Sequence, residues 1–463
     1  MKKRGWMAAA LLLVCGILAA GIFLAHGRRV QFSPAQTFTG DRNRMTVSAS
    51  VTEDLRTVKG SMKLEAVNRT GEALEEIVLR TFADAMQENS LHIGAVRVNG
   101  EEAAFDRQEP SVLRVKRAWK PEERVVLECD FALTVRTGEG MLGRTEERAV
   151  LLGALPTLAV WEDGGWRTDE LDVLAEPSYA EAFDLEVTLT LPEGVQAAFG
   201  GAMIADDQNE NGTHTQTAQM SGARDVSFLL FAEGKLRQKQ VQHVLVSAYD
   251  EAGKTASTLV QSAEKALNTL EKIGFAYPFP ALTIVRGDMG KEDGLSLSGL
   301  AVVSEDVEGK ELDRQVMRLT ARQIFGISVE SDPWKEPWLS QTLASAVELL
   351  GYRAEKGDAA FEKRFFSDVE IATRLTRPHG VNVGAGVEAF GDDHEMTQVL
   401  RDQGAAGLLG IAKAAGEDNF LRALACYARE NAGGFGSVEG LLEALKAETG
   451  SSWEGYLFDI LKQ

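Results

Sequence analysis

The chain has little cysteine and little histidine, and neither residue type forms a recognisable chemical motif. Three cysteines and six histidines are spread over 463 residues. Cys129 alternates with apolar residues in "RVVLECDFALTV", and Cys426 lies in the helical pattern "LRALACYAR", so both are predicted to be core residues rather than a disulfide framework. No two histidines stand three or four residues apart, and no Gly-x-Ser-x-Gly elbow occurs, so neither a helical pair of histidine ligands nor a serine-hydrolase motif is present.

An excess of basic residues is also lacking. Lys and Arg number 49 against 69 Asp and Glu, for a formal net charge of -20. Five of the basic residues and none of the acids lie in the first 29 residues, so the remainder carries 44 basic and 69 acidic residues, a net charge of -25. Such a surface repels phosphate backbones, which argues against a nucleic-acid partner.

The N-terminus has one long uncharged apolar run, "MAAALLLVCGILAAGIFLA", at residues 7–25. At about 1.5 Å per residue, a helix of this length crosses a bilayer core of about 30 Å. The preceding "MKKRGW" is basic, which favours a cytoplasmic N-terminus. Residues 1–29 are therefore predicted to form a cytoplasmic stub and an uncleaved signal anchor, although "AHG" leaves cleavage open. The expected location is the cell membrane, single-pass, with the main body extracytoplasmic.

Residues 30–238 show the two-residue period of β-strands. In "AFDLEVTLTL" apolar and polar residues alternate, as a half-buried strand requires. Asn99-Gly100 stands between two strand-like runs and predicts a hairpin turn. The range is therefore predicted to be an antiparallel β-sandwich domain.

From residue 239 to 463 the pattern becomes mostly helical. "KTASTLVQSAEKALNTLEKIG" places its apolar residues on one helical stripe, and a short strand, "ALTIVRG", follows. Asp392 is predicted to cap a helix, with Glu395 three residues on. The remaining predictions are a Gly-rich loop at 287–299, helices at 311–326, 338–355, 404–415 and 418–431, and a last helix at the C-terminus.

The order of these segments resembles that of a peptidase family. A sandwich, "YPFPALTIV", a Gly-rich loop, a helix with "ARQIFG", then "EPWL" and a helical end follow one another over 30–463. This order resembles the aminopeptidase N type of zinc metallopeptidase. The resemblance implies an aminopeptidase-like β-sandwich at 30–238, followed by a thermolysin-like, mostly helical α/β peptidase domain at 239–463.

The resemblance also implies a zinc site, from which this chain departs. The family carries His-Glu-x-x-His, in which the histidines bind Zn²⁺ and the glutamate is the general base, and a later glutamate is the third ligand. In "RLTARQIFG", Arg318 and Arg322 stand at the histidine positions and Leu319 at that of the base. Gln341 stands at the third ligand, 19 residues after Arg322. Because a guanidinium keeps its proton, it offers a metal no lone pair, so no metal is expected.

Two further positions of the family's machinery have changed. The loop that holds the substrate's amino group maps onto "GLSLS" at 294–298, with Ser296 at the glutamate position. The tyrosine that stabilises the transition state maps onto Arg401. The chain is therefore predicted to be a degenerate family member without a catalytic residue and without a cofactor.

A pseudopeptidase that binds a peptide or protein partner is the first hypothesis. Arg318, Arg322 and Arg401 would then bind carboxylate or phosphate groups. In the alternative interpretation these arginines pair internally, with the candidate acids Glu336, Asp332 and Glu292.

Two other functions stay open. One is an active zinc metallo-aminopeptidase by descent, which requires bound zinc. The other is a structural subunit of a membrane complex such as a transporter, for which the cleft has no role.

Overall fold

The computed structural model describes residues 40–250, 255–291, 294–371 and 380–462. The predicted anchor at 7–25 lies outside these residues, as does Glu292. Within the described ranges, no helix combines the length and the apolar character needed to cross a membrane.

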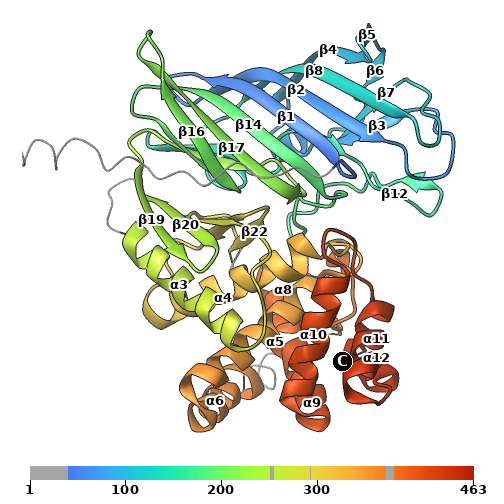
Figure 1. The fold of residues 1–463 in the computed structure, drawn as a ribbon, viewed down its shortest axis with the longest axis vertical. Helices are drawn as coiled ribbons and strands as arrows, with labels where there is room; N and C mark the ends of the chain where they lie inside the picture. Colours follow the sequence, from blue (N-terminus) through green and yellow to red (C-terminus); the bar gives the residue numbers. More distant parts are fainter. Residues whose placement is uncertain (1–39, 251–254, 292–293, 372–379, 463) are drawn as a thin grey trace, which may run out of the picture. The chain divides into compact units, whose positions relative to one another are not determined.

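The N-terminal half consists of β-strands, as predicted (Figure 1). Its eight-stranded sheet has the order β16 (Ala202–Gln208), β17 (Thr213–Ala223), β14 (Phe183–Pro192), β1 (Asn43–Val51), β2 (Thr57–Val67), β8 (Arg124–Thr134), β4 (Leu91–Val98), β5 (Glu101–Glu102). Strands β1 and β14 pair in parallel, so the prediction of an entirely antiparallel sandwich is wrong at this pair. A parallel pair needs a long crossover connection, and the strands between β1 and β14 in the chain supply it.

Smaller sheets complete the sandwich. One has the order β15 (Gln196–Phe199), β18 (Phe228–Phe231), β10 (Arg148–Leu151), β9 (Leu142–Arg144). Another has the order β11 (Thr157–Leu158), β3 (Ile77–Arg80), β7 (Val112–Val115), β6 (Phe105–Asp106). The short elements are the helix α2 (Ala83–Met86) and the hairpin β12 (Trp161–Glu162) with β13 (Gly165–Trp166).

Local predictions in the sandwich are confirmed. Asn99 and Gly100 join β4 to β5 with φ values of 54° and 83°, as a tight hairpin turn requires. Cys129 is buried in β8, and burial raises the pKa of its thiol to about 12. A thiol with this pKa stays protonated, so Cys129 behaves as a core residue.

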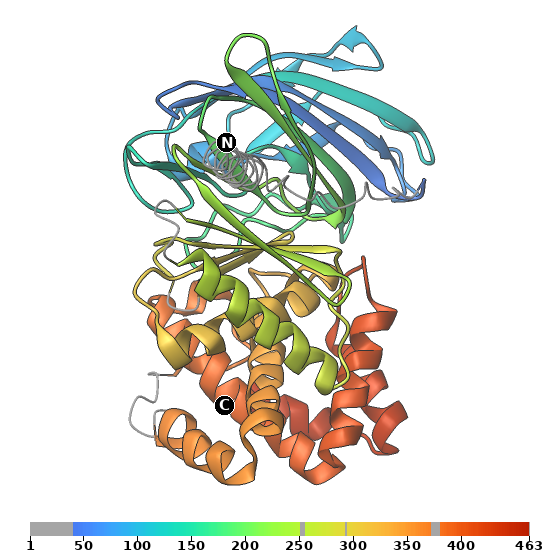
Figure 2. The same ribbon diagram turned by 60° about the vertical axis from the view of Figure 1, so that its left-hand side comes forward.

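A five-stranded sheet begins the C-terminal half. Its order is β19 (Lys235–Val241), β20 (Val244–Asp250), β21 (Ala281–Arg286), β23 (Leu300–Val303), β22 (Leu295–Leu297). Helices α3 (Ala256–Lys272) and α4 (Gly309–Arg322) pack against it (Figure 2). The predicted loop at 287–299 is partly wrong, because Leu295 and Leu297 pair with β23 as the edge strand β22. The predicted boundary at residue 238 falls inside β19.

The remaining elements are helical. They are η1 (Gln323–Ser328), α5 (Pro337–Lys356), α6 (Asp358–Arg364), η2 (Phe365–Ile371), η3 (Val387–Ala389), α8 (Asp393–Thr397), η4 (Gln398–Gly404), α9 (Ala405–Ala415), α10 (Glu417–Glu430), α11 (Val438–Thr449) and α12 (Glu454–Leu461). The predicted helices are confirmed. Asp392 caps α8 by accepting a hydrogen bond from the Glu395 backbone N–H at 2.8 Å, as predicted.

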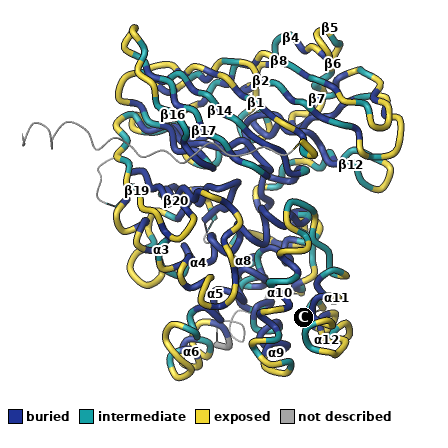
Figure 3. The backbone as a smooth tube through the Cα atoms, viewed as in Figure 1, coloured by how far each residue is buried: buried dark blue, intermediate teal, exposed yellow. Residues whose placement is uncertain are grey.

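One hydrophobic cluster joins the two halves. Strands β20 to β23 are almost wholly buried (Figure 3). Their apolar side chains pack against those of the sheet that contains β15 and β18. The cluster comprises Val150, Leu152, Ala198, Leu229, Phe231, Tyr249, Val285, Met289, Leu295, Leu297, Leu300 and Val302. The sandwich and the helical half therefore share a core.

Candidate functional site

The two arginines of the altered motif lie one turn apart at the end of α4. Arg318 is 5% exposed and Arg322 is 6% exposed. A buried guanidinium needs an acid or carbonyl partner, because desolvation of its charge is costly. The two side chains meet this need in different surroundings.

Arg322 is bonded to the sandwich half. Its Nη2 donates to Glu176 Oε1, and both side chains are buried. Glu176 lies 146 residues earlier, in the segment between β13 and β14. The metal-ligand position of the family motif is thus occupied by a salt bridge between the two halves.

Within the described ranges, three polar contacts hold residues 170–176, here called the strap, against the helical half. Trp334 Nε1 donates to the Glu170 carbonyl at 3.0 Å, and Lys291 Nζ donates to the Leu174 carbonyl at 2.9 Å. The Arg322–Glu176 pair is the third contact. The strap therefore covers the C-terminal end of α4 with a segment of the chain itself.

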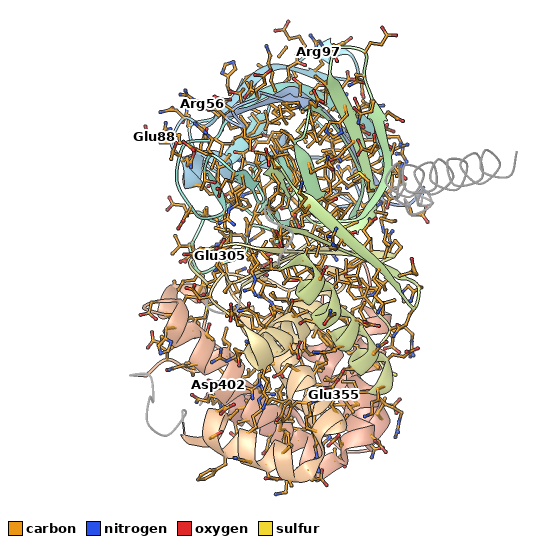
Figure 4. The ribbon with its side chains drawn as sticks, turned by 90° about the vertical axis from the view of Figure 1, so that its left-hand side faces the viewer. Arg56, Glu88, Arg97, Glu305, Glu355 and Asp402 are labelled. Atoms are coloured by element: carbon orange, nitrogen blue, oxygen red, sulfur yellow. The ribbon has the colours of Figure 1, made fainter. Side chains whose placement is uncertain are left out.

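Arg318 faces a cavity instead. Its Nη2 lies 3.4 Å from Glu311 Oε1 on the same helix. The cavity, of about 320 Å³, lies between α4, α5, α6, η2 and η4, and Arg401 also lines it. Arg401 Nε donates to Asp402 Oδ1 at 2.8 Å, and Figure 4 shows Asp402 among the helices. The structure thus brings Arg318 and Arg401 to one cavity, and Arg322 is not among the residues that line it.

The charges around this cavity are balanced. Among the described residues that line it, the arginines are Arg314, Arg318, Arg364 and Arg401, and the acids are Glu311, Glu348, Asp368 and Asp402. The Arg364–Glu348 pair is bidentate, with distances of 2.7 and 2.8 Å. A wall of equal and opposite charges does not select anions by net charge.

In the ranges that the structure describes, the acids that contact these arginines include Glu176, Glu311 and Asp402, which were not among the predicted candidates. Asp332, one of the predicted partners, instead lies 2.6 Å from Arg167 of the sandwich. Glu311 stands two turns before Arg318 on α4, and this helical spacing was an available signal. Glu176 had no such signal, because its contact depends on how the two halves pack.

The remaining positions of the altered site serve packing. Ser296 Oγ donates to the Leu319 carbonyl at 3.2 Å and accepts from Gln323 Nε2 at 2.7 Å. The Gln323 side chain also donates to the Leu297 carbonyl and accepts from the Gly299 backbone N–H. These bonds fasten α4 to the edge strand β22. Leu319 is fully buried beside Gly294.

The donor set at the motif does not fit zinc. Zn²⁺ is bound by thiolate, imidazole or carboxylate groups, whereas this site offers the guanidinium groups of Arg318 and Arg322 and the carboxamide of Gln341. Gln341 is half-buried on α5. In the part of the chain that the structure describes, no group of three or more His, Cys, Asp or Glu residues is placed to hold a metal ion.

Further buried charges lie where the sandwich meets the helical half. Arg224 is fully buried and donates to the carbonyls of Ala180, Ile327 and Gly434 at 2.7, 3.1 and 2.7 Å. Burial raises the pKa of the Glu330 carboxyl well above its ordinary value, although the Arg224 charge opposes this shift. Burial likewise raises the pKa of Asp225. This interface is therefore rich in charges that the protein itself must neutralise.

Comparisons with known proteins show the fold. No protein-family model and no curated protein sequence matches the chain. An M1 zinc metallopeptidase from Deinococcus radiodurans has 19% identity and a TM-score of 0.70, with 91% of this chain and 92% of that chain covered. A mutant of an M1 zinc metallopeptidase from the same organism has 18% identity and a TM-score of 0.70, with 93% and 96% covered. A two-domain M1 zinc metallopeptidase mutant bound to L-arginine has 19% identity and a TM-score of 0.69, with 91% and 93% covered. From the sandwich to the last helix, the chain thus has the fold of the M1 zinc metallopeptidases.

Proposed function

We propose that this protein is a catalytically inactive protein of the M1 peptidase fold that binds a peptide or protein partner. The salt bridge between Arg322 and Glu176 is the observation that carries the proposal. It places a cation and a segment of the chain where the family motif places a metal ligand. A cationic side chain repels Zn²⁺ and has no lone pair to offer it.

The other altered positions support the same conclusion. Leu319 is buried and has no group that accepts a proton from water. Ser296 is buried and bonded to Leu319 and Gln323, so it is not available to a substrate amine. A hydrolytic reaction that needs a metal, a base and an anchor for the substrate amine has none of the three at these positions.

Partner binding is proposed from the fold and from two neighbours. Structures with this fold include M1 zinc metallopeptidase mutants bound to L-arginine and to a Tyr-Ser-Ala substrate. We infer that a fold which presents peptides to a catalytic centre in these neighbours also offers this chain a surface for a peptide or protein partner. Fold alone does not establish function, so the proposal rests on the altered residues.

Zinc content and peptidase activity test the inactivity. We expect purified protein to contain no stoichiometric zinc and to release no amino acid from chromogenic aminopeptidase substrates. The matched variant carries Arg318→His, Leu319→Glu, Arg322→His and Gln341→Glu, together with Glu176→Gln to release the strap. We expect this variant to bind about one zinc per chain. A wild-type protein with one zinc and measurable activity would refute the proposal.

Membrane attachment through residues 7–25 is a separate part of the proposal. It rests on the length and apolar character of that run. A chain that starts at residue 30 is expected to move from the membrane fraction to the soluble fraction, while the full chain stays with the membrane. Equal distribution of the two chains would contradict an anchor.

A further inference from the structure

Glu176 lies among buried cations of the helical half. Arg322 is bonded to it directly, and the Lys291 side chain is only 7% exposed. Lys291 Nζ lies 4.0 Å from Asp393 Oδ1 and donates to the Leu174 carbonyl of the strap. Burial lowers the pKa of Lys291, the Asp393 and Glu176 charges oppose this, and the Arg322 charge adds to it. These effects place Lys291, Arg322 and Glu176 in one electrostatic group.

The strap combines an exposed tip with a buried end, in which Leu174 is 9% and Ala175 is 1% exposed. Val173 at its tip is 75% exposed, so this part of the strap lies at the surface. Its polar attachments to the helical half are the contacts of Trp334, Lys291 and Arg322. Only the Arg322 contact is a salt bridge between two buried side chains, and its carboxylate comes from another half of the molecule. A carboxylate from outside the chain has the same chemistry.

We propose that Arg322 is a carboxylate-binding site that Glu176 fills in the resting protein, while the neighbouring Lys291 holds the backbone of the strap. A glutamate, an aspartate or a C-terminal carboxylate of a partner peptide takes the place of Glu176 when the strap is displaced. This inference rests on the proposed function in that it names the chemistry of the bound partner. A buried Arg322 guanidinium without a carboxylate is strongly unfavourable, so the site is occupied either by the strap or by a partner.

The test removes the internal carboxylate and supplies one from solution. Glu176→Ala lowers the thermal unfolding temperature, and sodium acetate is expected to raise it again, whereas sodium chloride of equal ionic strength and acetamide are not. Wild-type protein is expected to show no specific response to acetate. The matched control is Glu417→Ala, which removes a carboxylate that lies 2.6 Å from the partly exposed Arg353. Acetate is expected to have no effect on the control.

A peptide with the sequence of residues 172–180, "DVLAEPSYA", is the second probe. It is expected to bind the Glu176→Ala protein and to bind wild-type protein at least about tenfold more weakly, because the strap competes. The same peptide with glutamine in place of its glutamate is expected to bind at least about tenfold more weakly. Adding Arg322→Met to Glu176→Ala is expected to abolish binding.

Two results would overturn the proposal. One is a folded Glu176→Ala protein, verified by circular dichroism, that responds to neither acetate nor the peptide. The other is equal binding of the glutamate and glutamine peptides. If Glu176→Ala does not fold, the nearly isosteric Glu176→Gln replaces it with the same expected outcomes. Bound zinc in the wild type would refute inactivity without affecting these measurements, so the two proposals fail independently.

Discussion

Arg318 and Arg322 lie one turn apart on α4 and contact different regions of the molecule. At Arg322 the helix ends against the sandwich, and the charge is neutralised by Glu176 from another half of the chain. At Arg318 the helix borders a cavity that is lined, among the described residues, by charged side chains of α4 itself and of the neighbouring helices. The same residue type at two positions one helical turn apart thus makes a sealed contact at one position and part of a charged cavity wall at the other. The surroundings, rather than the residue type, decide what each arginine does.

The loss of one charged partner is expected to cost more stability at the interface around Arg322 than at the cavity beside Arg318. Arg224, Glu330 and Asp225 are all buried at this interface, in addition to Arg322 and Glu176. Removal of one partner leaves the other charge without compensation, which costs more than the pair itself contributes. The Glu311 partner of Arg318, by contrast, is exposed over 47% of its side chain, so water compensates for the loss of this contact. This difference predicts the order of the following effects.

The largest effect is expected for Arg224→Met. The substitution removes the donors to the buried carbonyls of Ala180, Ile327 and Gly434 and the cation nearest to Glu330. We expect a loss of about 3–5 kcal/mol in the free energy of unfolding, measured by urea denaturation. Arg353→Met, at a pair with partly exposed partners, is the control and should cost about 1 kcal/mol or less. Similar losses of unfolding free energy for both variants would show that the buried interface charges contribute no more to stability than a partly exposed pair.

A direct comparison of the two motif arginines comes next. Arg322→Met is expected to cost about 3 kcal/mol, because it strands the buried Glu176 carboxylate. Arg318→Met is expected to cost about 1 kcal/mol, because Glu311 can turn to water. Chemical denaturation of both variants measures the difference. Equal losses of unfolding free energy would mean that Arg318 and Arg322 contribute equally to stability, despite their different surroundings.

The smallest effect concerns the pH dependence of stability. Burial raises the pKa of Glu330 above its unfolded value of about 4.3, so the folded chain holds this proton more tightly than the unfolded chain. The contribution of Glu330 to the free energy of unfolding is therefore largest at pH values below the unfolded pKa. It is lost as the pH rises through the folded pKa. Glu330→Gln removes the loss, so the variant should gain stability relative to wild type as the pH rises from about 4 to 8.

Denaturation series of wild type and Glu330→Gln over that range measure the difference. The exposed Glu210→Gln in the β16–β17 turn is the matched control for the loss of one carboxylate from the chain. A constant offset between wild type and Glu330→Gln would contradict the shifted titration.

Local patterns predicted most of the secondary structure, and long-range packing accounts for what they missed. The alternation in β14 and the stripe of α3 follow from periods of two and 3.6 residues, which a sequence displays directly. The strand β22 was not predicted because it lies in a Gly-rich segment without a strand pattern. Its strand conformation depends on the pairing with β23. The parallel pairing of β1 with β14 depends on topology in the same way.

In the candidate site, too, motif spacing predicted some features, whereas others depend on long-range packing. The positions of Arg318, Arg322 and Gln341 follow from motif spacing. The sequence predicted one site for Arg318, Arg322 and Arg401, whereas the structure brings only Arg318 and Arg401 of these three to one cavity. The partner Glu176 lies 146 residues from Arg322, in an irregular segment with no periodic pattern. Its contact is fixed by how the two halves pack, which a single sequence does not display.

The hydrophobic cluster shared by the two halves has a consequence for synthesis. Leu152, Leu229 and Phe231 are translated well before Leu295 and Val302, the residues that cover them in the finished structure. The sandwich therefore emerges from the ribosome with an apolar face uncovered, and it stays uncovered until the strands after residue 280 have been made. A chaperone that binds apolar surface can bind this face during that interval of translation.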